Sequence, residues 1–96
     1  MTFHHTHDIE KGLFTAQQDT QQAGEVSYYH SGAHTIVLDH TQVDPAFQGQ
    51  HLGQQLVDQV ADYARKNSLK VIPQCPYAKK LFEKSDAYQD IWQHEA

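Results

Sequence analysis

The chain has 96 residues, of which 39% are hydrophobic, and a formal net charge of −5 at pH 7, so residues 1–96 are expected to form one globular domain with one modest core. The negative charge argues against nucleic-acid binding, which needs a concentrated basic surface, and the single cysteine, Cys75, excludes an internal disulfide framework. No segment approaches the roughly 18–20 apolar residues of a membrane span, and the N-terminus has no apolar signal core, so the cytoplasm is the expected location.

The first half of the chain predicts an antiparallel meander of four strands. β-Branched and aromatic residues gather there between turn-forming residues, a pattern typical of strands. The polar residues 17–24 are expected to form a hairpin loop, and residues 31–33 a turn. Asp44 and Pro45 are expected to end the meander, because proline has no N–H to donate to a neighbouring strand. The expected strands are residues 3–9, 12–16, 24–30 and 35–43.

The second half predicts a helix, a strand and two more short helices. Over residues 52–67 the apolar side chains recur at helical spacing. A short apolar strand, residues 69–72, follows and is stopped by Pro73. A strand, a helix and another strand in this order make a right-handed crossover, so the two strands are expected to be parallel. Short helical pieces at 77–83 and 87–94 complete an α/β chain of α+β-like order.

A strand, a glycine-bearing loop and a helix N-terminus follow one another around Gly49 and Gly53. The free N–H groups of a first helical turn, together with the helix dipole, favour an anion at such a place. A nucleotide loop of the GxxxxGK[ST] type is excluded because no lysine–hydroxyl pair follows Gly53, and a dinucleotide fingerprint is a poor match. The pattern therefore predicts a phosphate-bearing ligand, and a coenzyme with a pyrophosphate and a long arm suits it.

Three segments carry a resemblance to a known family. They are His40-Thr41-Gln42-Val43 at the end of the fourth strand, Phe47-Gln48-Gly49-Gln50-His51-Leu52-Gly53 in the loop, and Val71-Ile72-Pro73-Gln74-Cys75-Pro76-Tyr77-Ala78 after the last strand. They resemble the motifs His-Thr-x-Val, Gln/Arg-x-x-Gly-x-Gly/Ala and Pro-x-Cys-Pro of the compact single-domain branch of the GNAT superfamily of N-acetyltransferases. The resemblance covers nearly the whole chain. His51 departs from it, because the family has glycine there, which lets the backbone approach a pyrophosphate.

The resemblance implies a GNAT-type fold, with a mixed, mostly antiparallel sheet, a V-shaped splay between the fourth and fifth strands, and helices packed on the sheet. It implies acetyl-CoA as the cofactor and an N-acetyltransferase that moves an acetyl group to a primary amine. The arm of the coenzyme would lie along Thr41, Gln42 and Val43. Its pyrophosphate would take backbone N–H groups of the loop, which are those of Gln48, Gly49, Gln50, His51, Leu52 and Gly53.

Three side chains are candidates for the chemistry of acetyl transfer. Cys75 could protonate the leaving sulfur, could take the acetyl group first as a nucleophile, or could be a small buried hydrophobic residue. Tyr77 is a rival acid or a core aromatic, and His40 is a candidate base or a residue that orders the turn at Thr41. The backbone N–H of Val43 is the expected donor to the thioester carbonyl, and direct attack by the amine is the expected mechanism.

Two other functions stay open from the sequence. The chain could bind coenzyme A or an acyl-CoA without transferring anything, which the departure at His51 favours. It could also be an interaction domain without a cofactor, in which Gly49 and Gly53 only shape a turn. The acceptor could be a small amine, a peptide or a protein. A monomer or a weak homodimer without nucleic acid or membrane contact is expected, since an exposed edge strand could pair two copies.

Titratable residues near both ends of the chain have simple interpretations. His4, His5 and His7 lie in the first expected strand, but no cysteine or paired carboxylate completes a tetrahedral metal site nearby, so no metal is expected. Acidic residues near the C-terminus indicate a solvated helix surface or, alternatively, the recruitment of a cationic amine. They are Asp86, Asp90 and Glu95.

Overall fold

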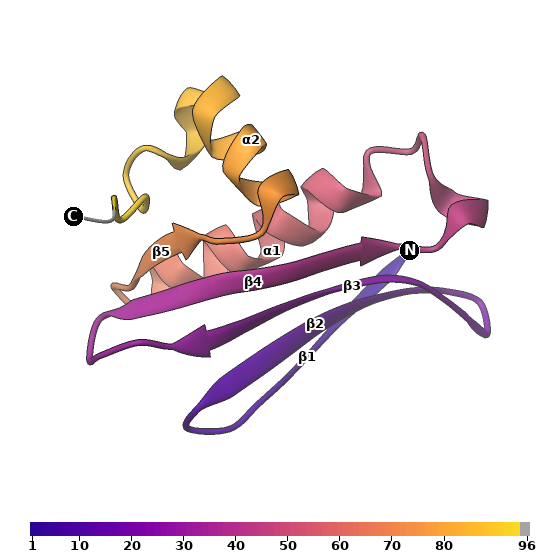
Figure 1. The fold of residues 1–96 in the computed structure, drawn as a ribbon. Helices are drawn as coiled ribbons and strands as arrows, with labels where there is room; N and C mark the ends of the chain where they lie inside the picture. Colours follow the sequence, from indigo (N-terminus) through magenta and orange to yellow (C-terminus); the bar gives the residue numbers. More distant parts are fainter. Residues whose placement is uncertain (95–96) are drawn as a thin grey trace.

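The computed structural model describes residues 1–94, which form five strands, two helices and two short 3-10 turns (Figure 1). In chain order these are β1 (Thr2–His7), β2 (Lys11–Gln18), β3 (Gln21–His30), β4 (Thr35–Val43), η1 (Pro45–Phe47), α1 (Leu52–Lys66), β5 (Lys70–Pro73), α2 (Pro76–Lys84) and η2 (Asp86–Tyr88). One sheet contains the strands in the order β1-β2-β3-β4-β5, with β1 to β4 antiparallel and β5 parallel to β4. The predicted fold class, an α/β chain with a mixed and mostly antiparallel sheet, is confirmed.

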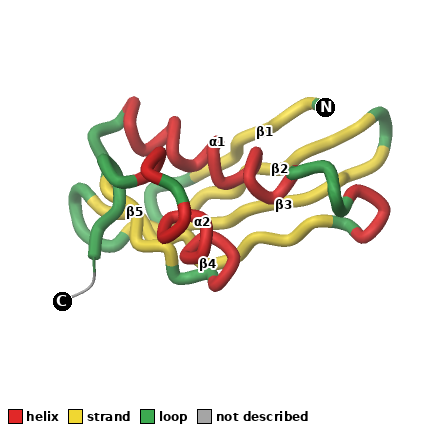
Figure 2. The backbone as a smooth tube through the Cα atoms, turned by 90° about the horizontal axis from the view of Figure 1, so that it is seen from above, coloured by secondary structure: helices red, strands yellow, loops and turns green. Residues whose placement is uncertain are grey.

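Both helices cover the same face of the sheet (Figures 1 and 2). Leu56, Val60 and Ala64 recur every fourth residue on α1 and are completely buried against the strands. Ala78 and Phe82 bring α2 into the same hydrophobic core. The loss of one such leucine typically costs about 2–5 kcal/mol, so this single core carries the fold. In the described part of the chain, no helix has the length and apolarity needed to cross a membrane.

The hairpin between β2 and β3 is much tighter than the sequence predicted. Gln18 and Gln21 face each other across the turn, and Asp19 closes it with a φ of 57°. The predicted loop at residues 17–24 is therefore wrong. Strand pairing satisfies the backbone groups of this polar segment, and glutamine side chains are tolerated in strands when they point to solvent.

The prediction of a second short helix over residues 87–94 is also wrong. After the single turn of η2 the chain runs beside β5, where the Val71 N–H donates to the Ile91 carbonyl oxygen (2.6 Å) and the Gln93 N–H donates to the Val71 carbonyl oxygen (2.8 Å). Trp92 forms an isolated parallel bridge with Val71. This pairing satisfies backbone groups at the outer edge of β5, which outweighs a weak helical pattern.

A β-bulge in β4 decides which of its side chains face the helices. β3 pairs with β4 at Leu38 and next at His40, so Asp39 is an extra residue in β4. Leu38, Thr41 and Val43 consequently share the face that the helices cover. Without the bulge, strict alternation would place His40 on that face instead.

β4 and β5 separate next to this bulge. Their pairing ends with Leu38 opposite Pro73, whereas β4 continues to Val43. At the point of separation the Leu38 carbonyl oxygen accepts the N–H groups of Gln74 and Cys75, both at 3.0 Å. These two bonds turn the chain away from β4 and into α2, which leaves the end of β4 without a β5 partner in the described chain.

His5 fixes the edge strand β1 to the core. Its ring stacks on Phe14 with the centroids 3.9 Å apart, and its Nε2 lies 2.7 Å from the hydroxyl oxygen of Tyr28. His7 stacks on His5 at 4.6 Å. Burial lowers the pKa of His5, and the neighbouring His7 lowers it further. A neutral imidazole therefore holds β1 in place.

The acidic residues near the C-terminus have different surroundings. Asp90 pairs with Arg65 of α1, with Oδ2 2.9 Å from Nε, so it ties the C-terminal segment to α1 and does not lie on a helix of its own. Asp86 begins η2. Glu95 lies outside the described residues.

Candidate cofactor site

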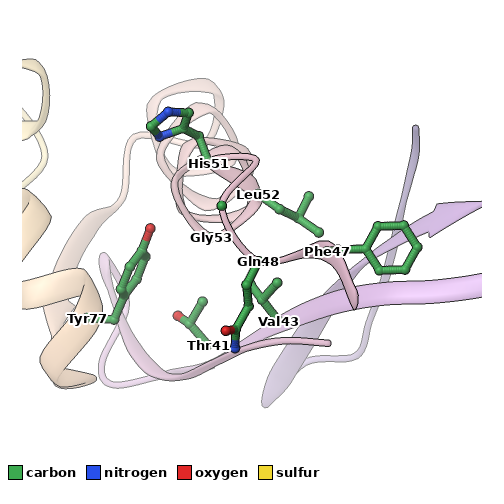
Figure 3. Close-up of a pocket in the computed structure, with 9 residues that line it drawn as sticks. Thr41, Val43, Phe47, Gln48, His51, Leu52, Gly53 and Tyr77 are labelled. Carbon is green, nitrogen blue, oxygen red and sulfur yellow. The ribbon is translucent and has the colours of Figure 1, made fainter. Parts of the chain in front are cut away.

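A pocket of about 410 Å³ opens between the end of β4, the loop after it and the starts of α1 and α2 (Figure 3). Its lining combines apolar side chains with a hydroxyl, an amide, an imidazole and a phenol. The lining residues are Thr41, Val43, Phe47, Gln48, Gly49, His51, Leu52, Gly53 and Tyr77. A concave site of this volume and mixed character is typical of small-molecule binding.

The loop between β4 and α1 adopts the left-handed conformation at two residues. Gly49 has a φ of +86°, and beyond its two chain neighbours no described residue has an atom within 4 Å of the place that a Cβ would take. His51 has φ 59° and ψ 24° at the N-cap of α1, a conformation that costs a residue with a Cβ roughly 1–2 kcal/mol. Of these two left-handed residues, His51 stands at the position where the motif has glycine.

The start of α1 presents the backbone N–H groups of Leu52 and Gly53, which no side chain of residues 1–94 caps. Within the described chain His51 makes no capping hydrogen bond, and the helical ladder begins with the Gln55 N–H, which donates to the His51 carbonyl oxygen at 3.1 Å. The N–H groups of Leu52 and Gly53 precede that ladder, and they carry the partial positive charge of the helix N-terminus. This end of the pocket is suited to a phosphate.

Thr41 has a buried polar atom in the pocket (Figure 3), the hydroxyl oxygen Oγ1. Its Oγ1 has no partner among residues 1–94, and an unpaired buried hydroxyl costs roughly 1–3 kcal/mol. The backbone adds further groups. The Asp44 N–H donates to the Ala23 carbonyl oxygen on β3 at 2.8 Å, and because successive residues of a strand point their N–H groups to opposite sides, those of Thr41 and Val43 point toward the gap beside β5. A polar ligand lying along the end of β4 fits these groups.

Tyr77 forms the side of the pocket that α2 provides. A Cβ at Gly53 would lie 2.7 Å from both Cζ and Oη of Tyr77, so the phenol lies directly against the start of α1. Burial raises the pKa of the phenol, Asp58 and then Cys75 raise it further, and a hydrogen bond with the Gln54 backbone opposes them. Tyr77, which is 42% exposed, is therefore a neutral phenol at neutral pH.

Several predicted site residues do not line the pocket. Cys75 is 7% exposed and is the N-cap of α2, beside the point where β4 and β5 separate. His40 is exposed on the sheet face opposite the helices, with its Nε2 3.3 Å from the side-chain oxygen of Gln42. Gln50 is exposed at the tip of the loop. The pocket thus brings together Thr41, Val43, the remaining loop residues and Tyr77, and leaves the thiol and the imidazole of His40 outside its lining.

Phe47 lines the pocket although the sequence did not single it out as a site residue. It ends η1, a turn that Asp44 begins by accepting the Ala46 N–H at 2.9 Å on its Oδ1. This turn directs the ring inward, where it is buried. An apolar residue directly before a glycine loop is the sequence signal that could have indicated it.

Comparisons with known proteins agree with this fold. The family model for the GCN5-related N-acetyl-transferase matches residues 13–91. A GCN5-like protein from Staphylococcus aureus, solved by NMR, is 30% identical, with a TM-score of 0.71 over 97% of this chain and 90% of that one. The ribosomal-protein-alanine N-acetyltransferase of Brucella melitensis is 26% identical, with a TM-score of 0.66 over 93% of this chain and 70% of that one.

A third solved structure shares the fold alone. It is a GNAT family acetyltransferase from Elizabethkingia anophelis with acetyl-CoA bound, 18% identical, with a TM-score of 0.63 over 88% of this chain and 65% of that one. None of the curated proteins matches the chain.

Proposed function

Because the chain belongs to the GCN5-related N-acetyltransferase family, we propose that residues 1–96 act as one domain that transfers the acetyl group of acetyl-CoA to a primary amine. The observation that carries this proposal is the pocket itself, in which a Thr41 hydroxyl and a start of α1 that both lack a side-chain partner among residues 1–94 occur together. A ligand with phosphates at one end and a polar arm suits both. The related enzyme with acetyl-CoA bound supports the choice of cofactor.

The residues that would hold acetyl-CoA follow from this arrangement. The N–H groups from Gln48 to Gly53 would bind the pyrophosphate, with His51 beside them. The backbone of β4 from Thr41 to Val43 would bind the arm, because its outward N–H groups lack a β5 partner in the described chain. Gln50 would contribute its backbone N–H, since its side chain is exposed, whereas the backbone groups of Gln42 point to β3, so Gln42 would only connect Thr41 to Val43 along the arm.

When bound, acetyl-CoA supplies an activated thioester carbonyl. Thr41 follows the bulge, and its N–H is the first to point into the gap beyond Leu38. Val43 lies at the phosphate end of β4, so we assign the stabilisation of the developing oxyanion to the Thr41 N–H in preference to that of Val43. Tyr77, a neutral donor in the pocket, would donate a hydrogen bond to the coenzyme.

Cys75 and His40 would act at the other end of the arm. The thiol lies where β4 and β5 separate, a position from which it could protonate the leaving sulfur or take the acetyl group. His40 points to the sheet face opposite the helices, so it could deprotonate only an amine that approaches from that face. We favour direct attack by the amine, because the buried thiol does not line the pocket.

The test is release of free coenzyme A from acetyl-CoA by the purified chain, with a panel of small primary amines, peptides with free N-termini and lysine-rich proteins as acceptors. One acceptor class should support turnover well above the hydrolysis seen without an amine. Calorimetric titration with coenzyme A runs in parallel. If coenzyme A binds and no acceptor is acetylated, the transferase proposal fails and the second candidate function replaces it.

That second candidate is a module that binds coenzyme A or an acyl-CoA without transfer. The observation that favours it is the position of His40 and Cys75 outside the pocket lining. Failure to bind coenzyme A at all would contradict both functions.

A further inference from the structure

Strand β1 is an open edge of the sheet (Figure 2). It pairs only with β2, in one continuous register that runs from Thr2 opposite Gln17 to His7 opposite Gly12. The other outer strand, β5, has its free side covered by residues 91–93, which exchange two hydrogen bonds with Val71. Among residues 1–94, no segment covers β1 in the same way.

The hairpin after β1 shows which backbone groups of the strand point outward. The Asp8 N–H donates to the Lys11 carbonyl oxygen at 2.9 Å, so these two residues form a hydrogen-bonded pair. Along an antiparallel ladder, hydrogen-bonded pairs alternate with pairs that are not hydrogen-bonded. Counting back from Asp8, the even-numbered residues of β1 bond to β2, and the odd-numbered residues direct their N–H and C=O groups away from the sheet. These odd-numbered residues are Phe3, His5 and His7.

β1 lacks the features with which natural edge strands avoid pairing. Such strands usually carry a lysine, a proline, a bulge or an inward-pointing charge. Residues 2–7 contain no Lys, Arg, Asp, Glu or Pro, and their pairing with β2 has no shift of register. The outer side of β1 can therefore accept a further strand.

A second copy of the same chain fits this edge. When two β1 strands run antiparallel with His5 opposite His5 of the second copy, Phe3 lies opposite His7 of that copy. The outward N–H and C=O groups of all three residues then bond to one another. This register also places aromatic rings opposite each other on the side of the sheet that the helices cover, where the His5 ring already stacks on Phe14.

The charge of the chain also favours β1 as the contact between two copies. Each copy has a formal net charge of −5 at pH 7, so two copies repel each other over most of their surface. None of the acidic residues lies in residues 2–7. Pairing through β1 therefore brings two uncharged strands together.

We propose that two copies of this chain pair through β1, antiparallel and centred on His5, so that two five-stranded sheets become one. Strands of six residues are too short to bury the roughly 1,200–2,000 Å² of a specific, stable interface, so the dimer is weak and forms at high concentration. β1 is at the opposite edge of the sheet from β5, and both cofactor pockets stay open. The pairing does not depend on the proposed function.

Amide hydrogen exchange tests the register. The full chain, labelled with ¹⁵N, is followed by NMR from micromolar to millimolar concentration, with sedimentation in parallel to measure the mass. In the monomer, the N–H groups of Phe3, His5 and His7 should exchange much faster than those of His4 and Thr6, which bond to β2. As the mass rises to that of two chains, the three odd-numbered groups should become protected.

Two results of this experiment would overturn the proposal. One is a chain that stays monomeric at millimolar concentration. The other is a dimer in which the N–H groups of Phe3, His5 and His7 remain unprotected, because its contact would then lie elsewhere on the chain.

Two double variants test the same register through exposed side chains. His4 and Thr6 are exposed, and in the proposed pairing His4 of each copy lies opposite Thr6 of the other. His4→Lys with Thr6→Lys places like charges opposite each other and should raise the Kd of the dimer several-fold, whereas His4→Glu with Thr6→Lys places opposite charges there and should lower it. Both leave the outward residues and the hydrogen bonds to β2 in place.

The change in overall charge acts against this expectation, which makes the comparison stricter. The variant with two lysines is less negative than the wild type, which by itself would favour association. A weaker dimer in that variant can therefore come only from the local pairs. Equal Kd values in the two double variants, or a tighter dimer in the variant with two lysines, would contradict the pairing centred on His5.

Discussion

The ring of Tyr77 occupies the space that a side chain at position 53 would need. A Cβ on Gly53 would lie 2.7 Å from Cζ and Oη of that ring, closer than van der Waals contact allows. The glycine therefore permits α2 to bring a phenol against the first turn of α1. Gly53 has a packing reason to be glycine that is separate from any approach of its backbone to a phosphate.

Gly53→Ala should displace the Tyr77 ring and weaken the binding of coenzyme A several-fold, while the chain remains folded. Alanine improves helix propensity by up to about 1 kcal/mol, and the clashing atoms are the far end of a side chain that can move. Calorimetric titration gives the Kd values. In a Tyr77→Ala background, Gly53→Ala should weaken the binding of coenzyme A little further. A further loss of affinity as large as in the wild type would show that the clash with Tyr77 is not the cause.

Thr41→Val should stabilise the chain without ligand and weaken its affinity for coenzyme A. Valine replaces a buried hydroxyl that has no partner among the described residues, which removes a penalty of about 1–3 kcal/mol. Urea unfolding measures the first effect and calorimetry the second. Thr41→Ser is the control that keeps the hydroxyl and should retain affinity. A fall in stability for Thr41→Val would indicate that the hydroxyl has a partner in solution.

His51→Gly should raise stability by about 1 kcal/mol, because glycine adopts a φ of 59° without the strain of a Cβ. For a domain of this size that corresponds to a rise in Tm of roughly 4–8 °C. Asp19→Gly is a matched control, since Asp19 has a φ of 57° in a hairpin far along the chain from the pocket. Both variants should be stabilised, and only His51→Gly should change the Kd for coenzyme A. A lower Tm for His51→Gly would contradict the strain argument.

The stability of the chain should decrease as the pH falls below about 6.5. Burial, and then His7, lower the pKa of His5 in the folded chain from its ordinary value of 6.5. Below 6.5 the unfolded chain takes up the proton more readily than the folded one, so the stabilisation present above pH 6.5 is lost as the pH falls toward the folded pKa. Urea midpoints at several pH values measure the slope.

His5→Gln should flatten that slope, because it removes the titrating ring that contacts Phe14 and Tyr28. His4→Gln serves as the control, since His4 is exposed on the same strand, and it should leave the slope unchanged. Equal slopes in the wild type and in His5→Gln would show that other groups cause the pH dependence.

Cys75→Ala should retain most of the turnover if the amine attacks the thioester directly and the thiol does not protonate the leaving sulfur. If the acetyl group instead passes through the thiol, this variant should lose all turnover. It should also lack any acetyl adduct that mass spectrometry detects on the wild type. Because Cys75 is buried, the substitution also leaves a small cavity, and urea unfolding separates that loss of stability from a loss of chemistry.

The order of strands and the long helix could be predicted because their patterns are local. The apolar spacing of α1 and the β-rich run of β4 each indicate one structure. The segment after η2 could not be predicted, because Ile91 and Trp92 fit a short helix as well as an extended strand. Hydrogen bonds exchanged between that segment and Val71 decide between them, and these depend on the tertiary fold.

The loop part of the pocket could be predicted for the same reason, since glycines directly before a helix are a local pattern that indicates an anion-binding loop. The position of Tyr77 against Gly53 depends on how two helices pack, and the outward direction of His40 depends on one extra residue in β4. Neither feature can be predicted from the residue pattern. The hydrogen bond that the Tyr88 hydroxyl donates to Asp58 is a similar case, because the two residues are thirty apart in the sequence.

The extra residue in β4 has a consequence for how this pocket can vary. Deleting Asp39 would shift the rest of the strand by one step and exchange its two sides, so that an imidazole and an amide would point where a hydroxyl and an isopropyl group now do. A single-residue insertion or deletion there would thus change several of the side chains that line the cavity at once, whereas a substitution would change only one.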